Sequence, residues 1–271
     1  MPELPEVETI KCGIATSLEG QTIKSVLVRK KQLRWPIPDI LSSILPKQSI
    51  ISIRRRGKYL LCECTKGHIL IHLGMSGNLQ VLPPETELKK HDHVDIVFTN
   101  GLCLRYNDPR RFGCILWTEA PILEHKLLTK LGPEPLEEEF TGKYLYDRAK
   151  NRRVLIKNFI MDSNVVVGVG NIYANEALFF ARIHPERVVS KISLVEYKRL
   201  AKIIKLVLQV AIKKGGTTLR NFTDSSGKPG YFKQELKVYG KTGEICSQCG
   251  TIIHSKKIGQ RATYYCPICQ R

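Results

Sequence analysis

The residues best suited to chemistry in this chain begin at its first positions, where Pro2 is followed by Glu3. A small residue after the initiator Met usually allows that Met to be removed, so we expect Pro2 to become the first residue. Its amine would then titrate near ~8, well below a lysine side chain. An unprotonated amine can form a Schiff base with an aldehyde-type carbon, and Glu3 could move a proton beside it. The structural alternative is a helix start, where Pro and Glu are also favoured.

A second set of reactive groups lies near the C-terminus, in two Cys-x-x-Cys pairs separated by sixteen residues. Two such turns complete a tetrahedron of thiolates with no open position, which predicts one structural Zn²⁺. A redox-active dithiol pair is the alternative. The predicted ligands are Cys246, Cys249, Cys266 and Cys269.

The remaining cysteines are scattered through the first 114 residues, in or beside apolar stretches. A chain of this length without a secretory signal does not need a disulfide framework. We therefore expect reduced, buried core thiols at Cys12, Cys62, Cys64, Cys103 and Cys114.

The charge of the chain predicts a polyanionic partner. Its 271 residues carry a formal net charge of +18, spread along the sequence. Nucleic acid fits better than a membrane surface, because no basic amphipathic helix with an aromatic face is present. We find neither an apolar run of about eighteen residues nor a signal peptide, which favours a cytoplasmic protein.

The elements that must position these groups divide the chain in two. Apolar residues at helical spacing predict a first helix over Pro5–Leu18. Short β-rich runs follow up to Thr118, separated by turn residues, and favour an antiparallel sandwich. The predicted strands are Ile23–Val28, Ile50–Ile53, Tyr59–Cys64, Ile69–Leu73, Val94–Phe98, Leu102–Tyr106 and Cys114–Trp117, with a short helix over Asp39–Leu45.

After an acidic, Pro-containing stretch the pattern becomes helical. The predicted helices are Tyr144–Lys150, Val154–Met161, Asn171–Ala181 and Ser193–Lys214. We expect a sandwich domain over 1–132, a linker over 133–140, a helical domain over 141–237 and the zinc ribbon over 238–271. The polar, Pro-rich connection Leu82–Asp92 is expected to be mobile.

Motifs along the whole chain resemble the bacterial formamidopyrimidine-DNA glycosylases. Besides the zinc ribbon, they are Pro2-Glu3-Leu4-Pro5-Glu6-Val7-Glu8-Thr9, Arg56-Gly57-Lys58-Tyr59, His72-Leu73-Gly74-Met75-Ser76-Gly77, Asn107-Asp108-Pro109-Arg110-Arg111-Phe112-Gly113, Val169-Gly170-Asn171-Ile172-Tyr173-Ala174-Asn175-Glu176 and Lys228-Pro229-Gly230-Tyr231-Phe232.

The resemblance implies a bifunctional, monomeric DNA-repair enzyme in the bacterial cytoplasm, associated with the nucleoid. It implies excision of oxidised purines such as 8-oxoguanine and formamidopyrimidines from double-stranded DNA, followed by β,δ-elimination at the abasic site. The implied fold is α+β and multidomain. It has an N-terminal β-sandwich, a helix–two-turns–helix domain and a Cys₄ zinc ribbon.

The resemblance also implies roles for single residues. Pro2 is the nucleophile, Glu3 protonates the sugar ring oxygen, Lys58 transfers a proton in β-elimination and Arg261 donates one in δ-elimination. Glu6 supports the site or serves only as a first-turn acid. The wedge that fills the space left by the extruded nucleotide is Met75, Arg110 and Phe112.

Phosphate contacts are implied for Lys157 and Asn171, and Asn171 could also serve as a helix N-cap. His91 and Arg152 are further DNA-contact candidates. The segment Thr217–Lys237 corresponds to a loop over the extruded base. Two alternatives stay open: an endonuclease VIII-like glycosylase for oxidised pyrimidines, and a non-catalytic zinc-ribbon DNA-binding protein.

Overall fold

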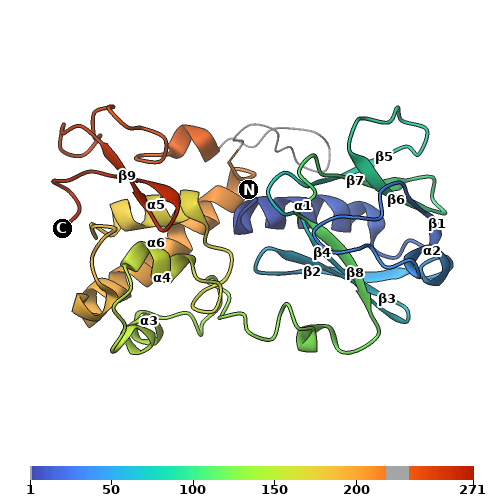
Figure 1. Cartoon of the computed structure of the whole chain (residues 1–271), viewed down its shortest axis with the longest axis horizontal. Coiled ribbons are helices and arrows are strands. Elements are labelled where there is room, and N and C mark those ends of the chain that lie inside the picture. Colours follow the sequence, from blue (N-terminus) through green and yellow to red (C-terminus); the bar gives the residue numbers. More distant parts are fainter. Residues whose placement is uncertain (1, 218–231) are drawn as a thin grey trace. The chain divides into compact units, whose positions relative to one another are not determined.

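The computed structural model describes residues 2–217 and 232–271, which form two compact units (Figure 1). The first unit contains residues 2–129 and 214–217. The second contains residues 130–213 and 232–271. Within these described residues, no helix has the length and apolar character needed to cross a membrane.

The first unit begins with helix α1, Leu4–Leu18. Its buried side chains Val7, Ile10, Ile14 and Leu18 recur at the spacing of one helix face, as the sequence predicts. This face packs on strands of both sheets of the unit (Figure 1). Packing of this hydrophobic face therefore fixes the position of the N-terminal end of α1, next to Pro2 and Glu3.

Two four-stranded antiparallel sheets form a sandwich around one core. The first sheet has the order β1-β6-β7-β5 and the second the order β2-β3-β4-β8. Leu104 and Tyr106 of the first sheet share the core with Leu60 and Ile71 of the second. The strands are β1 Ile23–Val28, β2 Ile50–Arg56, β3 Tyr59–Cys64, β4 Gly67–His72, β5 Asn78–Leu82, β6 Asp92–Phe98, β7 Cys103–Asn107 and β8 Cys114–Thr118.

Each strand predicted from the sequence is present, with ends shifted by up to three residues. Strand β5 was not predicted, because it is an edge strand of five residues of which only Leu79 is buried. The expectation for Cys12 was wrong: its side chain is exposed on α1, whereas the other four scattered thiols are buried. Burial raises the pKa of the Cys64 thiol to about 12, which keeps it protonated.

The second unit is helical with a small ribbon. Helix α6 packs against both α3 and α5, and α5 also contacts α4 and β10. Thr141 caps α3 by accepting the Tyr144 N–H at 3.0 Å. The elements are α3 Gly142–Ala149, α4 Ile156–Met161, α5 Asn171–Phe180, α6 Leu194–Lys213, β9 His254–Ile258 and β10 Arg261–Tyr265, with α2 Leu41–Ile44 in the first unit and 3₁₀ turns η1 Ile122–Glu124, η2 Val189–Lys191 and η3 Phe232–Glu235.

The stretch expected to be a linker, residues 133–140, is attached to the second unit. The Val167 N–H donates to the Pro133 carbonyl at 3.2 Å, and Phe140 is 1% exposed. These residues are therefore part of the packing of that unit.

His72 ends β4 and is held neutral by its surroundings. Its ring packs on Tyr59, with 4.7 Å between the ring centroids, and its Nδ1 accepts the Gly74 N–H at 3.0 Å. Because Nδ1 accepts, the neutral ring carries its proton on Nε2. Burial lowers the pKa of His72 to about 4, and the charges of Lys58 and Arg34 lower it further.

This shift predicts a pH dependence of stability in the first unit. Between pH 6.5 and 4 the unfolded His72 binds a proton that the folded ring refuses, so stability falls as the pH falls. A shift of this size corresponds to about 3 kcal/mol. Urea unfolding at pH 7 and pH 4, followed by fluorescence, measures this loss, because both tryptophans, Trp35 and Trp117, lie in this unit.

The matched variant is His72→Gln, which keeps an acceptor and does not titrate. It should lose about 3 kcal/mol less than the wild-type protein between the two pH values. Equal losses in the two proteins would contradict the assignment of a neutral His72.

Candidate active site and metal centre

The N-terminal residues are fixed by one buried carboxylate. Pro2 and Glu3 are buried, and Glu3 is the N-cap of α1. Glu6, only 2% exposed, accepts the Glu3 N–H through Oε2 at 2.8 Å. Its Oε1 accepts the N–H of Thr217 at 2.7 Å. Glu6 thus ties the start of α1 to a residue 211 positions away in the same unit.

Gly216 is required beside this carboxylate for two reasons. Its φ is +79°, in the region that disfavours side chains. A Cβ there would also lie 2.9 Å from Glu6 Oε1. The close approach of this backbone to Glu6 explains how the Thr217 N–H reaches the carboxylate.

Lys58 lies in the two-residue turn between β2 and β3, where Gly57 has a φ of +57°. Arg55 supports this turn by donating to the Gly57 carbonyl at 3.0 Å. The positive charge of Lys58 contributes to the lowered pKa of His72. His72 was part of a recognised motif but had no predicted role. A lone His at a strand end gives no sequence signal that it is half-buried and neutral.

Met75 and the 110–112 segment lie in turns, as the sequence predicts. Met75 is half-buried between β4 and β5, and Phe112 is 44% exposed between β7 and β8. The Arg110 guanidinium lies 4.8 Å from the centre of the Phe112 ring. Both turns belong to the first unit, so it brings the three predicted wedge residues into adjoining turns.

A fully buried carboxylate, Asp108, connects these two turns. It accepts the Ser76 hydroxyl at 2.6 Å, beside Met75, and the Gly113 N–H at 2.9 Å, beside Phe112. A cleft of about 580 Å³ opens next to the second turn. It is lined by Gln32, Leu33, Arg34, Arg110, Arg111 and Phe112.

The two weaker DNA-contact candidates lie in different settings. His91 is half-buried and has a φ of +83°, which is uncommon for a residue with a side chain. Arg152, in the second unit, is also half-buried, and its guanidinium lies 5.8 Å from the centre of the Phe159 ring. Its guanidinium is therefore in contact with an aromatic ring of the same unit.

In the second unit, Lys157 and Asn171 hold the ribbon hairpin. Lys157 is 0% exposed and donates to the Ala262 carbonyl at 3.0 Å and to Thr263 Oγ1 at 2.6 Å. The Asn171 side-chain amide donates to the same carbonyl at 2.9 Å. The N-cap role considered for Asn171 is wrong, since α5 begins at Asn171 and its N-cap is Gly170.

Arg261 is exposed at the start of β10, directly before this anchored carbonyl. The turn that precedes it, Gly259-Gln260, has positive φ at both residues, as a type I′ hairpin turn requires. The fixed turn and the anchored Ala262 carbonyl together set the position from which Arg261 projects.

Glu176 was quoted only as part of a motif, yet it is a buried anchor. Its carboxylate accepts the backbone N–H groups of Lys237, Val238 and Tyr239 at 2.8–3.0 Å. Burial raises the pKa of Glu176, and the three N–H groups oppose that rise. Glu176 therefore holds one end of the predicted Thr217–Lys237 segment. Residues 218–231 of that segment lie outside the described residues, as does Met1.

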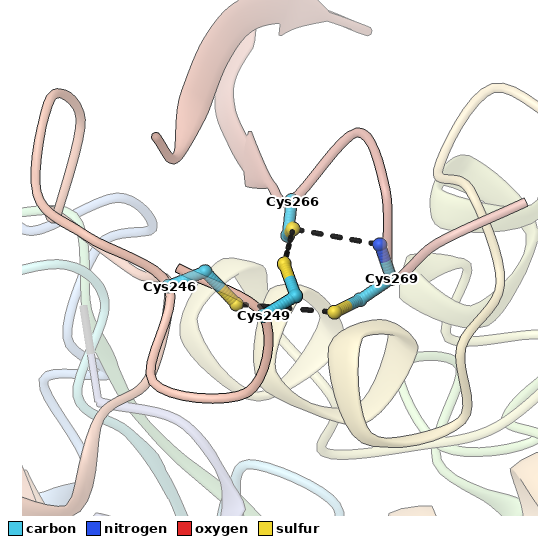
Figure 2. Close-up of side chains that lie close together, drawn as sticks. All are labelled: Cys246, Cys249, Cys266 and Cys269. Carbon is cyan, nitrogen blue, oxygen red and sulfur yellow. Dashed lines mark hydrogen bonds between the residues drawn. The ribbon is translucent and has the colours of Figure 1, made fainter. Parts of the chain in front are cut away.

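The four predicted metal ligands converge in the ribbon (Figure 2). All four sulfurs lie within 4.8 Å of one another, with Cys249 and Cys266 at 3.4 Å and Cys246 and Cys269 at 3.9 Å. Thiolates at about 2.3 Å from a tetrahedral Zn²⁺ would be roughly 3.8 Å apart. The donor set therefore fits one structural zinc. None of the nine cysteines, all of which are among the described residues, is in a disulfide.

Comparison with protein families matches three consecutive segments of the chain. The N-terminal domain of formamidopyrimidine-DNA glycosylase matches residues 1–115, and the H2TH domain of the same enzyme matches residues 131–223. A zinc finger found in this glycosylase and in isoleucyl-tRNA synthetase matches residues 243–271.

Curated and solved relatives cover the whole chain. The formamidopyrimidine-DNA glycosylase of Nitrosococcus oceani is 56% identical over 270 residues and covers 100% of both chains. A Lactococcus lactis Fpg mutant in complex with Fapy-dG-containing DNA has a TM-score of 0.93 at 35% identity, with 100% of both chains covered. The Lactococcus lactis Fpg complex with abasic-site DNA has a TM-score of 0.92 at 35% identity and covers 99% of both chains. The chain belongs to the formamidopyrimidine-DNA glycosylase family.

Proposed function

We propose that this chain is a bifunctional DNA glycosylase of base-excision repair that releases oxidised purines and then cleaves the strand at the abasic site. The observation that carries the proposal is a family match over the full length, together with Pro2 and Glu3 at the capped start of α1. The relatives complexed with Fapy-dG and abasic-site DNA support the two halves of the activity.

The chemistry follows from the N-terminal amine. With Met1 removed, the Pro2 amine forms a bond to C1′ of the damaged nucleotide as the bond from C1′ to the base breaks, and the proton that the amine releases neutralises the departing base. The nitrogen becomes an iminium when the bond from C1′ to the ring oxygen then breaks. Glu3, at the N-cap of α1, protonates the ring oxygen and helps the ring open. The iminium acidifies the adjacent sugar protons, and Lys58 takes part in their transfer as the 3′ phosphate leaves. Arg261 donates a proton when the 5′ phosphate leaves.

The exposed wedge holds the duplex open. Extrusion of the nucleotide leaves a gap in the base stack, which Met75 and Phe112 fill, while Arg110 donates to the unpaired partner base. Both turns are fixed by Asp108, so the wedge is formed before DNA arrives. His91 and Arg152 add contacts to the phosphate backbone of the DNA.

In the second unit, Asn171 and Arg261 contact phosphates of the DNA backbone. Lys157 acts by holding the hairpin that carries Arg261. The four cysteines hold a Zn²⁺ that stabilises the ribbon and takes no part in the chemistry. The segment at 217–237 covers the extruded base. The protein acts as a monomer inside the cell, where its DNA substrate lies, in association with the nucleoid.

The first prediction separates the two elimination steps. Arg261→Ala should leave base release and β-elimination largely intact and slow δ-elimination on the order of 100-fold, since a general acid contributes that much. The measurement resolves β and β,δ products on a gel, from a duplex with one 8-oxoguanine opposite cytosine.

The matched control is Lys257→Ala, an exposed basic residue on the neighbouring strand, paired with Ala262. It should cleave as the wild-type protein does. Equal loss of base release and δ-elimination in Arg261→Ala would remove its assigned role. Cleavage only of a duplex with an oxidised pyrimidine would move the substrate to the endonuclease VIII-like class.

The second prediction concerns the metal. Removing zinc with a chelator should unfold the ribbon and abolish DNA binding, because so small a segment cannot build a stable core alone. Tryptophan fluorescence should not change, since Trp35 and Trp117 both lie in the first unit. Binding is measured by fluorescence anisotropy of a labelled duplex. A fluorescence change that tracks zinc loss would contradict separate folding of the two units.

A further inference from the structure

The connection between β5 and β6, residues 83–91, is held in place along its length. We call it the 83–91 strap. Its composition predicted a mobile loop, and the structure shows that three buried or half-buried side chains bind its backbone. The strap ends with three consecutive basic residues, Lys89, Lys90 and His91.

Arg105 on β7 holds the first half of the strap. Its side chain is 3% exposed, and it donates to the carbonyls of Pro84 at 3.2 Å and Thr86 at 2.8 Å. Its Nε and Nη2 also donate to the Asp95 carboxylate at 2.9 and 3.0 Å. A planar guanidinium with five donors can satisfy a carboxylate and two carbonyls together, which a lysine cannot.

The second half is held from β6 and β7. The Asp92 carboxylate accepts the Lys89 N–H at 2.8 Å, and Asn107 donates to the Lys90 carbonyl at 3.3 Å. The Asp108 N–H donates to the His91 carbonyl at 3.1 Å. The backbone of each of the three basic residues therefore makes a hydrogen bond that holds it in place.

His91 adopts a left-handed conformation, with a φ of +83°. A residue with a side chain keeps this conformation only when its surroundings impose it, and such strain is concentrated at functional sites. Here the strain comes directly before β6 and is held by Asp108, whose carboxylate also fixes the wedge turn. The basic end of the strap is therefore positioned relative to Arg110 and Phe112.

Lys89 and Lys90 are exposed, and the structure records no ion pair for either within the described residues. Lys89, Lys90 and His91 are three consecutive hydrogen-bond donors on a fixed backbone, and such donors suit the phosphates of a DNA strand. Because the strap is already ordered, binding does not have to order it first.

We propose that Arg105 is a positioning residue that preorganises Lys89, Lys90 and His91 as a contact edge for the DNA phosphodiester backbone. The proposal rests on the proposed function and adds Lys89 and Lys90 to its DNA contacts, with Arg105 as the residue that positions them. Arg105 itself touches no DNA.

The test measures the affinity of the protein for a labelled undamaged duplex as a function of salt. Each lost phosphate contact lowers the slope of log affinity against log salt by about 0.9. Arg105→Ala should lower that slope by roughly 2 and weaken binding about tenfold at low salt. The triple variant Lys89→Ala, Lys90→Ala, His91→Ala should do the same or slightly more. Adding Arg105→Ala to the triple variant should produce no further loss.

Arg29→Ala is the matched control, because Arg29 donates to the same Asp95 carboxylate at 2.6 Å and has no recorded contact with the strap. It should keep the wild-type slope. Asn107→Ala is a second variant, which keeps every arginine, releases the Lys90 carbonyl and removes the 2.7 Å bond from Asn107 to the Asp92 carboxylate. It should lower the slope by about 1.

Equal slopes in wild type and Arg105→Ala, or the same loss in Arg29→Ala, would overturn the positioning role. So would additive losses in the quadruple variant, because they would show that Arg105 acts independently of the strap. Cleavage of an 8-oxoguanine duplex by the wild-type protein is measured in parallel. If the wild-type protein cleaves but the salt slopes of the variants do not change as expected, only this proposal is wrong. If the wild-type protein neither binds nor cleaves the duplex, the proposed function is wrong.

Discussion

Among the described residues, one buried carboxylate joins the first helix to a distant part of the chain through two hydrogen bonds. Glu6 accepts the N–H of Glu3 at the start of α1 and the N–H of Thr217 after α6. Losing the carboxylate would leave two amides unpaired, each at a cost of about 1–3 kcal/mol. The hydrophobic face of α1 places the helix in the sandwich, and Glu6 places Pro2 and Glu3 at its end. The chemistry proposed for Pro2 requires that position to be fixed, since an amine must be aligned with the carbon it attacks.

The same arrangement recurs at three places where side chains are proposed to meet DNA. The exposed group lies in a turn, and a buried polar group next to it is satisfied by the backbone of that turn. Asp108 does this for the wedge, Arg105 for the 83–91 strap and Lys157 for the hairpin that carries Arg261. These turns can present functional side chains at the surface because buried polar side chains hydrogen-bond to their backbone and fix it.

Local patterns predicted much of this protein from its sequence. The spacing of apolar residues predicted α1, the alternating runs predicted most strands, and two Cys-x-x-Cys pairs predicted a tetrahedral donor set that the structure bears out. The helix and the strands follow from patterns that span a few neighbouring residues. The donor set follows from cysteine, whose thiolate is a metal ligand. The resemblance to a family implied the α+β fold class with a helix–two-turns–helix part and a zinc ribbon, which the family matches confirm.

What the sequence did not predict depends on contacts between distant residues. Nothing local in the sequence shows that Lys157 is buried and donates to the Ala262 carbonyl, 105 positions away. The same holds for the N-cap role considered for Asn171 and for the ordered 83–91 strap, which looks mobile by composition but is bound by Arg105. A buried polar partner changes the role of a residue, and that partner is visible only in the folded chain.

The most direct test of the account is borohydride trapping on a duplex with one 8-oxoguanine opposite cytosine, comparing wild type with Pro2→Gly and Glu3→Gln. Reduction converts the Schiff base into a stable covalent adduct. The account predicts an adduct in the wild-type protein that maps by mass to the N-terminal proline, with Met1 absent. No adduct, with tight DNA binding retained, would contradict it and leave a DNA-binding protein without this chemistry.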